Sequence, residues 1–203
     1  MLTLLYIVCA LALLQGIVSL VQGFSAVRHI RTYRPRSDSR PRVVVFCPCK
    51  GIDEGFDENV RSILSQRYPH IRVVFVVDDK GDPAVAVLDE LKAPILVAGP
   101  ATSRGQKVHN LIHGVEHAAA DAEVFVFCDS DARYPNDWIA NLIAPLDDPN
   151  VAVSSGYRWY AAETGSLPSL LRSTWNAAAV TMQGDHNRNF AWGGSMSIRR
   201  DIF

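Results

Sequence analysis

The stretch that decides the fold is Val124-Phe-Val-Phe-Cys-Asp129-Ser130-Asp131, an apolar run that ends on two carboxylates. Continuous apolar residues are typical of a short strand that is covered on both faces of a sheet. If the extended backbone continues through Asp131, the side chains of Asp129 and Asp131 point the same way. Ligands of open α/β sheets bind at the carboxyl ends of the strands, and paired carboxylates there suit a hard divalent cation such as Mg²⁺. The alternative is a solvated acidic turn, because D-x-D triplets are common.

The N-terminal residues are uncharged and predominantly apolar. No charged residue precedes Arg28, and the run from Leu2 to Val21 is mostly Leu, Val, Ile and Ala. About 20 such residues are enough for a helix that crosses a bilayer. A cleaved signal peptide usually has a basic start and an apolar core of roughly 7–15 residues, which does not fit, and a buried core helix of this length would be unusual. We therefore expect residues 1–24 to be a transmembrane anchor.

The residues that follow, 25–42, form a basic linker. They include six arginines, two prolines and a single acid, Asp38. Basic residues beside a membrane helix stay on the cytosolic side, so we expect the rest of the chain to lie in the cytosol. The same charge favours contact with anionic headgroups. A nucleic-acid-binding arm is the weaker interpretation, since the net charge of the chain is −1.

From Val43 onward, apolar strands alternate with helices. This alternation predicts an α/β fold with βαβ units, a mainly parallel sheet and right-handed crossovers. A domain rarely ends just after a strand, so we expect an N-terminal fragment in which residues 43–203 are a partial domain. The expected strands are 43–47, 71–77, 95–97, 124–128, 151–154 and 195–198, and the expected helices are 57–66, 83–91, 106–119, 136–143 and, with a weaker pattern, 169–182.

A second acidic pair, Asp78-Asp79, follows the second expected strand. In a parallel sheet this pair and Asp129 meet at the same edge, and that convergence is more specific than either motif alone. Lys50 follows the first strand and adds a cation. Lys107 opens a helix whose N-terminus and loop amides suit phosphate. Together these groups describe a nucleotide-diphosphate site, and the chain has no Walker motif that would make it a P-loop.

Several short segments follow one another in an order that matches a known family. They are Lys50-Gly51, Asp78-Asp79 with Gly81-Asp82-Pro83-Ala84, Lys107 with Asn110, Cys128-Asp129-Ser130-Asp131 with Arg133, and Gly193-Gly194-Ser195-Met196. In these segments the chain resembles family 2 glycosyltransferases over residues 43–203. The resemblance is closest to the ceramide glucosyltransferase branch and its bacterial relatives in lipid and hopanoid glycosylation, because of Arg133 and the Lys107-x-x-Asn110-Leu111 segment.

The resemblance implies a GT-A fold and transfer of a sugar, with inversion, from a nucleotide-diphosphate donor similar to UDP-glucose. It also implies a lipid acceptor at the cytosolic membrane face. Asp129 and Asp131 would hold Mg²⁺ or Mn²⁺, which offsets charge on the leaving diphosphate; some relatives of this branch lack an acid at the position of Asp131. The donor-binding residues implied in this way are Lys50, Asp78, Asp79, Lys107 and Asp129.

Inversion needs a base that removes the proton of the acceptor hydroxyl. In the family this base belongs to a third acidic motif, followed by a Q-x-x-R-W-like motif, and both come after the Gly-Gly-Ser-Met region. We therefore expect the base, and further membrane segments, beyond Phe203, and we expect residues 1–203 alone to be inactive. Asp185 is the late candidate within the chain, but its context does not match the family's base.

Other functions fit parts of the pattern. An aspartate-nucleophile phosphatase would use Asp129 and Asp131, but its motif belongs on an early strand and Arg133 stands at a position where it has Thr or Val. A receiver domain has a similar acidic pair, but it needs a later lysine and none follows Lys107. A non-catalytic sugar-nucleotide-binding protein has the same motifs and stays open as an alternative.

The remaining reactive side chains have plainer interpretations. Three histidines share a helix face, and without a motif such as H-E-x-x-H they favour a packed or solvated face over a metal site. A cytosolic chain is expected to keep its cysteines as free, buried thiols. Trp192 and the segment Tyr157-Arg158-Trp159-Tyr160 are candidates for the acceptor entrance, with ordinary packing as the alternative.

Overall fold

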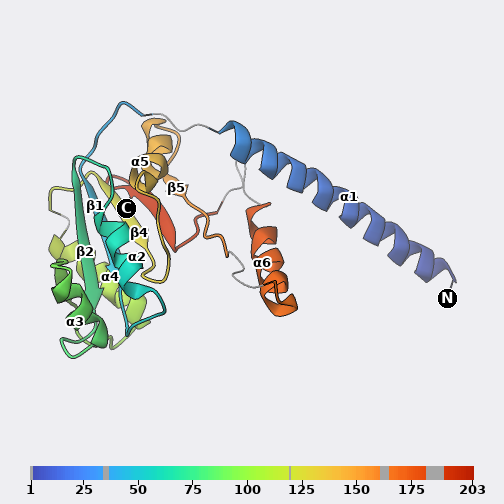
Figure 1. Ribbon diagram of the computed structural model, residues 1–203. Coiled ribbons are helices and arrows are strands. Elements are labelled where there is room, and N and C mark those ends of the chain that lie inside the picture. The colour runs from blue at the N-terminus through green and yellow to red at the C-terminus, as the bar shows by residue number, and fades with distance from the viewer. Residues whose placement is uncertain (1, 34–36, 119, 161–164, 182–189) are drawn as a thin grey trace. The chain divides into compact units, whose positions relative to one another are not determined.

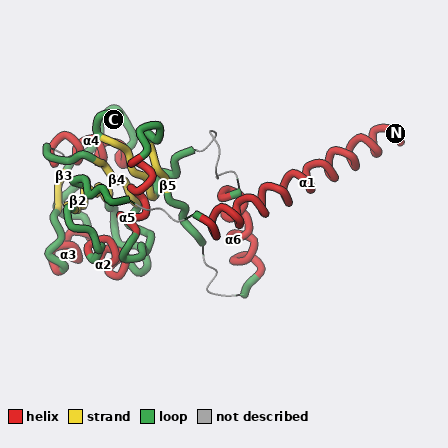
Figure 2. The backbone as a smooth tube through the Cα atoms, turned by 90° about the horizontal axis from the view of Figure 1, so that it is seen from above, coloured by secondary structure: helices red, strands yellow, loops and turns green. Residues whose placement is uncertain are grey.

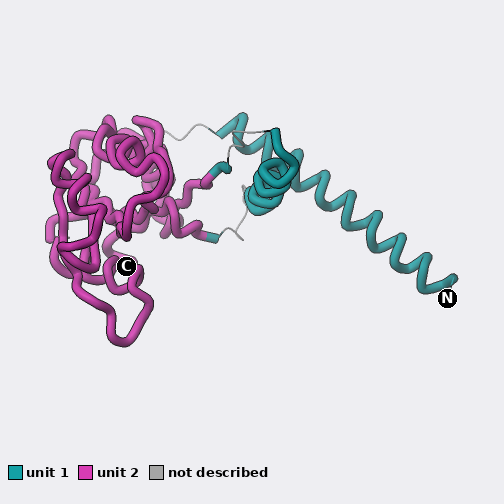
Figure 3. Tube along the Cα trace, turned by 60° about the horizontal axis from the view of Figure 1, so that its bottom comes forward, with its two compact units in different colours: residues 1–34, 159–190 teal, residues 35–158, 191–203 magenta. Residues whose placement is uncertain are grey.

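The structure is a computed structural model of the 203-residue chain, and it describes residues 2–33, 37–118, 120–160, 165–181 and 190–203 (Figure 1). The chain forms two compact units. One consists of residues 1–34 and 159–190, and the other of residues 35–158 and 191–203 (Figure 3). The second unit contains every strand that the structure describes.

The second unit is built on a six-stranded sheet with the order β3-β2-β1-β4-β6-β5. The first four strands along the chain are parallel, and β6 runs antiparallel to both of its neighbours. The expected α/β fold with a mainly parallel sheet is therefore confirmed. The strands are β1 (Val43–Pro48), β2 (Ile71–Val77), β3 (Ile95–Val97), β4 (Val124–Cys128), β5 (Val153–Ser155) and β6 (Ser195–Arg199).

The central strands are apolar throughout because helices cover both faces of the sheet. On β1, Val45 and Cys47 pack with α2 (Phe56–Leu64), α3 (Pro83–Glu90) and α5 (Trp138–Ile143). Val44 and Phe46 point to the other face, where α4 (Gln106–Ala118) packs. A short 3₁₀ helix, η1 (Ala144–Asp147), continues α5. The two buried layers hold the parallel strands so that their carboxyl ends share one edge.

Most elements lie where the sequence pattern predicts them, with small differences at the ends. The helix expected at 136–143 begins at Trp138, whose backbone N–H closes a turn onto the carbonyl of Pro135 at 3.0 Å. The strand expected at 151–154 is β5, which begins at Val153 because Val151 closes a turn onto Asp148. Residues 119 and 182, the expected ends of two helices, lie outside the described residues.

The first unit contains two helices, α1 (Leu2–Thr32) and α6 (Leu167–Val180) (Figure 2). The apolar part of α1 has a mean hydropathy of 2.5 over an 18-residue window, and none of that window is buried. The helix is long and apolar enough to cross a membrane. It continues past the expected end of the anchor at residue 24 and carries Arg28 and Arg31 on its last turns.

Helix α4 approaches the sheet very closely at Gly114. A Cβ atom added there would lie 2.8 Å from Cδ1 of Phe46 and 3.3 Å from Cγ2 of Val76. Neither Phe46 nor Val76 is exposed, so their side chains have little room to move. Glycine at this position therefore sets the distance between α4 and the sheet.

Overpacking a buried site usually costs about 1–3 kcal/mol, and alanine in a helix interior recovers about 1 kcal/mol of that cost. We therefore expect Gly114→Ala to destabilise the protein by up to about 2 kcal/mol. Chemical denaturation followed by circular dichroism measures the difference. Glu116→Ala on the exposed side of α4 is the control, and equal stability of both variants would contradict the close approach.

Candidate functional site

The loops after β1 and β2 meet at Asp78. The ammonium of Lys50 lies 3.2 Å from Oδ2 of Asp78, and the side-chain amide of Asn110 donates to Oδ1 at 3.1 Å. Asp78 is largely buried, with 18% of its side chain exposed, whereas Lys50 is exposed. The structure thus brings together two residues that the sequence places at the donor site, and α4 holds them through Asn110.

Gln106 orients Asn110 and was not predicted from the sequence. Its amide nitrogen donates to Oδ1 of Asn110 and to the carbonyl of Gly99, both at 2.8 Å, and its oxygen accepts from the N–H of Ala101. These bonds tie the loop after β3 to the first turn of α4. The sequence signal for this contact is a glutamine and an asparagine four residues apart at the start of a helix, because side chains at that spacing are neighbours.

Asp79 and Asp82 have separate roles in the loop after β2. Asp79 is exposed and accepts a 2.6 Å hydrogen bond from the N–H of Gly81 in its own loop. Asp82 caps α3 by accepting from Ala84 N–H, and it also accepts from Gly51 N–H at 2.9 Å. Gly51 has φ +68°, a conformation that favours glycine. Asp82 therefore fixes the loop that carries Lys50.

Asp129 lies at the centre of the edge that the carboxyl ends of the parallel strands share. Its Oδ1 accepts from the ammonium of Lys107 at 2.5 Å, so two residues that were expected separately at the donor site are in contact. Its other oxygen faces the turn before β6, where a Cβ on Gly194 would lie 2.7 Å from Oδ2. The backbone N–H of Asp129 also donates to the carbonyl of Gly194. Only glycine leaves room for the carboxylate at this point.

Asp131 does not continue the strand geometry of Asp129. Strand β4 ends at Cys128, and a turn follows at residues 130–131. The carboxylate of Asp131 instead accepts two hydrogen bonds from Arg158, at 2.8 Å from Nη1 and 2.7 Å from Nη2. Nη1 of Arg158 also lies 3.9 Å from Oδ2 of Asp129. The two aspartates thus share a site through an arginine, because the extended backbone that would align them ends before Asp129.

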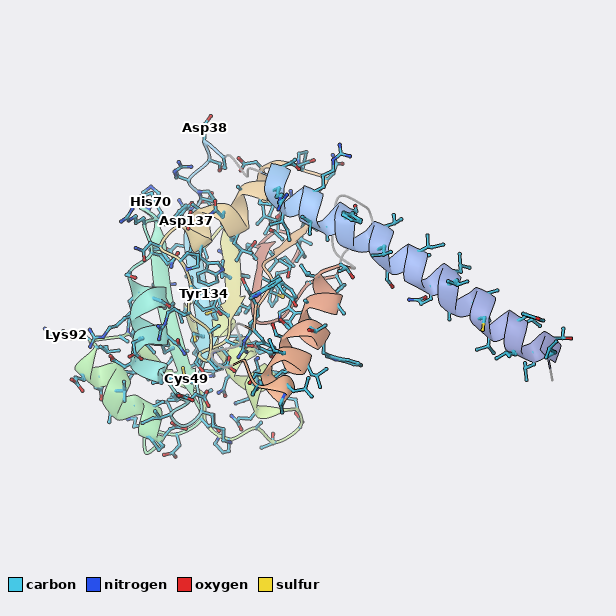
Figure 4. All side chains as sticks on the ribbon, turned by 45° about the vertical axis from the view of Figure 1, so that its right-hand side comes forward. Asp38, Cys49, His70, Lys92, Tyr134 and Asp137 are labelled. Atoms are coloured by element: carbon cyan, nitrogen blue, oxygen red, sulfur yellow. The ribbon has the colours of Figure 1, made fainter. Side chains whose placement is uncertain are left out.

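A buried tyrosine bonds the backbone on both sides of the centre of the site. The hydroxyl of Tyr134 (labelled in Figure 4) lies 3.1 Å from the carbonyl of Asp129 and 2.9 Å from that of Gly194. Burial raises the pKa of Tyr134 well above its ordinary value, so the hydroxyl stays protonated and can donate. Nearby, the indole of Trp138 donates to Ser195 Oγ at 2.9 Å. These bonds hold the end of β4 against the start of β6. Neither Tyr134 nor Trp138 was expected from the sequence to have this role.

Three cysteine thiols lie at the ends of β1 and β4, next to this edge of the sheet. Cys47, Cys49 (Figure 4) and Cys128 are buried and free, as expected. The hydrogen bond with Cys47, together with burial, raises the pKa of the Cys49 thiol, so it stays neutral. Within the described part of the chain, no group of three or more His, Cys, Asp or Glu side chains forms a metal site.

The histidine stripe of α4 makes contacts of the kind expected for a packed helix face. The rings of His113 and His117 stack with centroids 3.9 Å apart, and those of His109 and His113 are 6.3 Å apart. A ring nitrogen of His109 lies 3.1 Å from the carbonyl of Ala98. Desolvation lowers the pKa of His113, which keeps the middle ring neutral.

The chain matches the family described as Glycosyl transferase family 21 over residues 4–203. It belongs to that family. The glycosyltransferase class expected from the motifs is thereby confirmed, and the family that the chain shows is family 21. Gln106 and Tyr134 were not expected at this edge, and Arg158 was expected only as part of a segment at the acceptor entrance and not beside Asp129.

Solved structures show the GT-A fold that was expected. The mannosyltransferase PcManGT from Pyrobaculum calidifontis, in complex with GDP-Man and Mn²⁺, has a TM-score of 0.63 at 22% identity and covers 95% of this chain. Glucosyl-3-phosphoglycerate synthase from Mycobacterium tuberculosis, in complex with Mn²⁺, UDP and phosphoglyceric acid, has a TM-score of 0.52 at 18% identity and covers 79%. The family 21 chain spans 55% and 56% of the length of these two proteins.

The pair Gly193 and Gly194 offers a matched test of the site. We expect Gly194→Ala to displace the Asp129 carboxylate, because the new Cβ would stand 2.7 Å from Oδ2. Gly193→Ala is the control, since a Cβ there has no heavy atom within 4 Å. Calorimetry with a nucleotide and Mn²⁺ should show binding lost in the first variant and kept in the second. Equal binding by both would contradict the proposed centre of the site.

Proposed function

We propose that this chain binds a nucleotide-diphosphate sugar, such as UDP-glucose, at the carboxyl edge of the sheet and transfers the sugar with inversion to a lipid acceptor. The observation that carries the proposal is the convergence of charged side chains from separate segments of a family 21 chain on Asp129. The solved neighbours with GDP-Man or UDP and Mn²⁺ support a nucleotide-bound metal in the same fold. In a ceramide glucosyltransferase-like enzyme, the acceptor is a membrane lipid.

The charge of the edge explains why a metal is needed. Among the described residues, three cations at this edge already pair with carboxylates: Lys50 with Asp78, Lys107 with Asp129 and Arg158 with Asp131. Because these charges offset one another, they attract a diphosphate only weakly. One divalent cation adds positive charge and makes the edge attractive to the donor.

The available oxygens suit Mg²⁺ or Mn²⁺. Such hard cations use one or two carboxylates and take their other ligands from water and substrate phosphates. Lys107 contacts only Oδ1 of Asp129, so Oδ2 is the oxygen that the proposal gives to the ion. The bound ion would offset the charge that develops on the leaving diphosphate. Asp129 is accordingly the residue that we assign to the metal first.

The protein side chains have distinct tasks in this proposal. The ammonium of Lys107, at the start of α4, attracts a phosphate of the donor as a point charge. Asp78, held by Lys50 and Asn110, and Asp79 lie beside the nucleotide. Inversion also requires a base on the acceptor side. We assign that role to none of the described residues, and Asp185 lies outside them.

Metal-dependent donor binding tests the proposal. We expect the full-length protein in detergent to bind a UDP-sugar only with Mn²⁺ or Mg²⁺, and Asp129→Asn to weaken this binding at least about tenfold, because the charge that holds the metal is lost. Titration calorimetry with UDP-glucose and GDP-mannose gives the affinities. Asp57→Asn on the exposed face of α2 is the control.

Failure of the folded wild type to bind any nucleotide sugar with either metal would overturn the proposal. Binding without transfer to any lipid acceptor by the full-length protein would favour the non-catalytic alternative. Family 21 membership and the GT-A fold favour glycosyl transfer over the aspartate-nucleophile phosphatase.

The first unit supports a lipid acceptor. Leu167, Leu171 and Trp175 lie along one face of α6 at intervals of four residues, and 60–86% of each is exposed. This face belongs to the same compact unit as α1. Tryptophan is enriched where a membrane meets water. We propose that α6 contacts the membrane surface, beside an anchor of residues 1–24 whose following linker, 25–42, is cytosolic.

Brominated lipids test this contact. In nanodiscs with brominated acyl chains, we expect part of the tryptophan fluorescence of the full-length protein to be quenched, and the quenched share to fall in Trp175→Phe. Trp138→Phe, which removes a core indole, should not lower that share. Equal quenching in wild type and Trp175→Phe would place Trp175 away from the lipid and remove this support for a lipid acceptor.

A further inference from the structure

We propose that Arg158 is a donor-positioning residue, and that Asp131 serves to hold its guanidinium beside Asp129 instead of binding the metal as a second carboxylate ligand. The inference rests on the proposed function, because it assigns Arg158 to the diphosphate of the donor. It adds a residue to the site and gives Asp131 a different task from the one that the D-x-D pattern suggests.

Arg158 contacts both oxygens of the Asp131 carboxylate. Oδ1 lies 2.8 Å from Nη1 and Oδ2 lies 2.7 Å from Nη2, which makes a two-pronged, charge-assisted contact. Nη2 also donates to the backbone carbonyl of Asp131 at 3.2 Å. A metal that used Asp131 would have to share these two oxygens with the guanidinium of Arg158. Asp129 has no comparable fork, since Lys107 contacts only its Oδ1.

The position of Arg158 suits the diphosphate. Nη1 of Arg158 lies 3.9 Å from Oδ2 of Asp129, whereas Lys107 contacts the other carboxylate oxygen, Oδ1. Each oxygen of the Asp129 carboxylate therefore has a cationic side chain near it, and a diphosphate that met a metal held there would lie within reach of both cations. A guanidinium stays charged and carries five N–H donors, more than the contacts with Asp131 use, whereas a lysine ammonium has three. Only 22% of the Arg158 side chain is exposed, and partial burial strengthens such contacts.

The backbone that carries Arg158 is held in place by the sheet. Strand β5 pairs with β6 through Ser155 and Met196, and the N–H of Gly156 donates to the carbonyl of Ser195 at 2.8 Å. A Cβ on Gly156 would lie 2.5 Å from Ser195 Oγ, so this close approach depends on glycine. The segment after β5 is thus fastened to the start of β6, directly beside the turn that faces Asp129.

Two measurements on the full-length protein in detergent separate this role from metal binding. The first is the affinity for Mn²⁺ alone, from the spin-resonance signal of the free ion. The second is the affinity for UDP or GDP at saturating Mn²⁺. The variants are Arg158→Gln, Asp131→Asn, their combination, and Asp129→Asn, with Arg61→Gln and Asp57→Asn as a matched control for an exposed Arg–Asp pair on α2.

We expect Arg158→Gln and Asp131→Asn each to lower nucleotide affinity by about tenfold to a hundredfold, the scale of one charge-assisted contact. The double variant should lose little more than either single one, because both changes remove the same contact. Mn²⁺ affinity should stay close to the wild-type value in both, and fall only in Asp129→Asn. The control variants should behave like the wild type.

Weakening of Mn²⁺ binding by Asp131→Asn to the same degree as by Asp129→Asn would overturn the inference, since Asp131 would then be a metal ligand. Wild-type nucleotide affinity in Arg158→Gln would also overturn it. Either result leaves the proposed function intact. A wild-type protein that binds Mn²⁺ but no nucleotide would instead overturn the proposed function, and the inference with it.

Discussion

The contact on which the rest of the site depends is the meeting of Asp129 with the backbone of Gly194. Cys128 pairs with Ser195 in the sheet, so the last residue of β4 and the turn before β6 are brought face to face. Glycine lets the carboxylate stand against that turn, and Tyr134 bonds the carbonyls on both sides. Lys107 and Arg158 can approach the two oxygens of Asp129 because the carboxylate is fixed there.

This arrangement couples the core to the charged edge. The strands are buried on both faces. Because β1, β2 and β4 are parallel, the loops that follow them lie along one edge of the sheet. The charges are then close enough to interact, but they are held by different elements: Lys50 by the loop that Asp82 fastens, Asp78 by α4, and Asp131 by the segment after β5. Rigid elements hold a charged cluster in place better than flexible loops, because less side-chain freedom is lost when a ligand binds.

The sequence was a good guide wherever the signal was local. The apolar run before Asp129 specified a buried strand, and the carboxylates after two strands specified the edge at which they meet. The meeting of Lys50, Asp78 and Asp129 at one edge followed from that rule, whereas the ion pairs Lys50–Asp78 and Lys107–Asp129 are seen only in the structure. The pleat of a strand was the wrong reason to pair Asp129 with Asp131, because β4 ends at Cys128 and the chain turns. Motif order indicated the glycosyltransferase class correctly, and the family model specified family 21.

By itself the sequence determined the α/β alternation, the apolar N-terminal helix and the acidic strand ends, because each depends on the spacing of neighbouring residues. Only the tertiary structure decided the place of Arg158. It follows a strand of three residues and meets Asp131 across 27 positions of chain. That contact exists because β6 runs antiparallel between β4 and β5 and brings their ends together, a pairing set by the packing of the whole sheet.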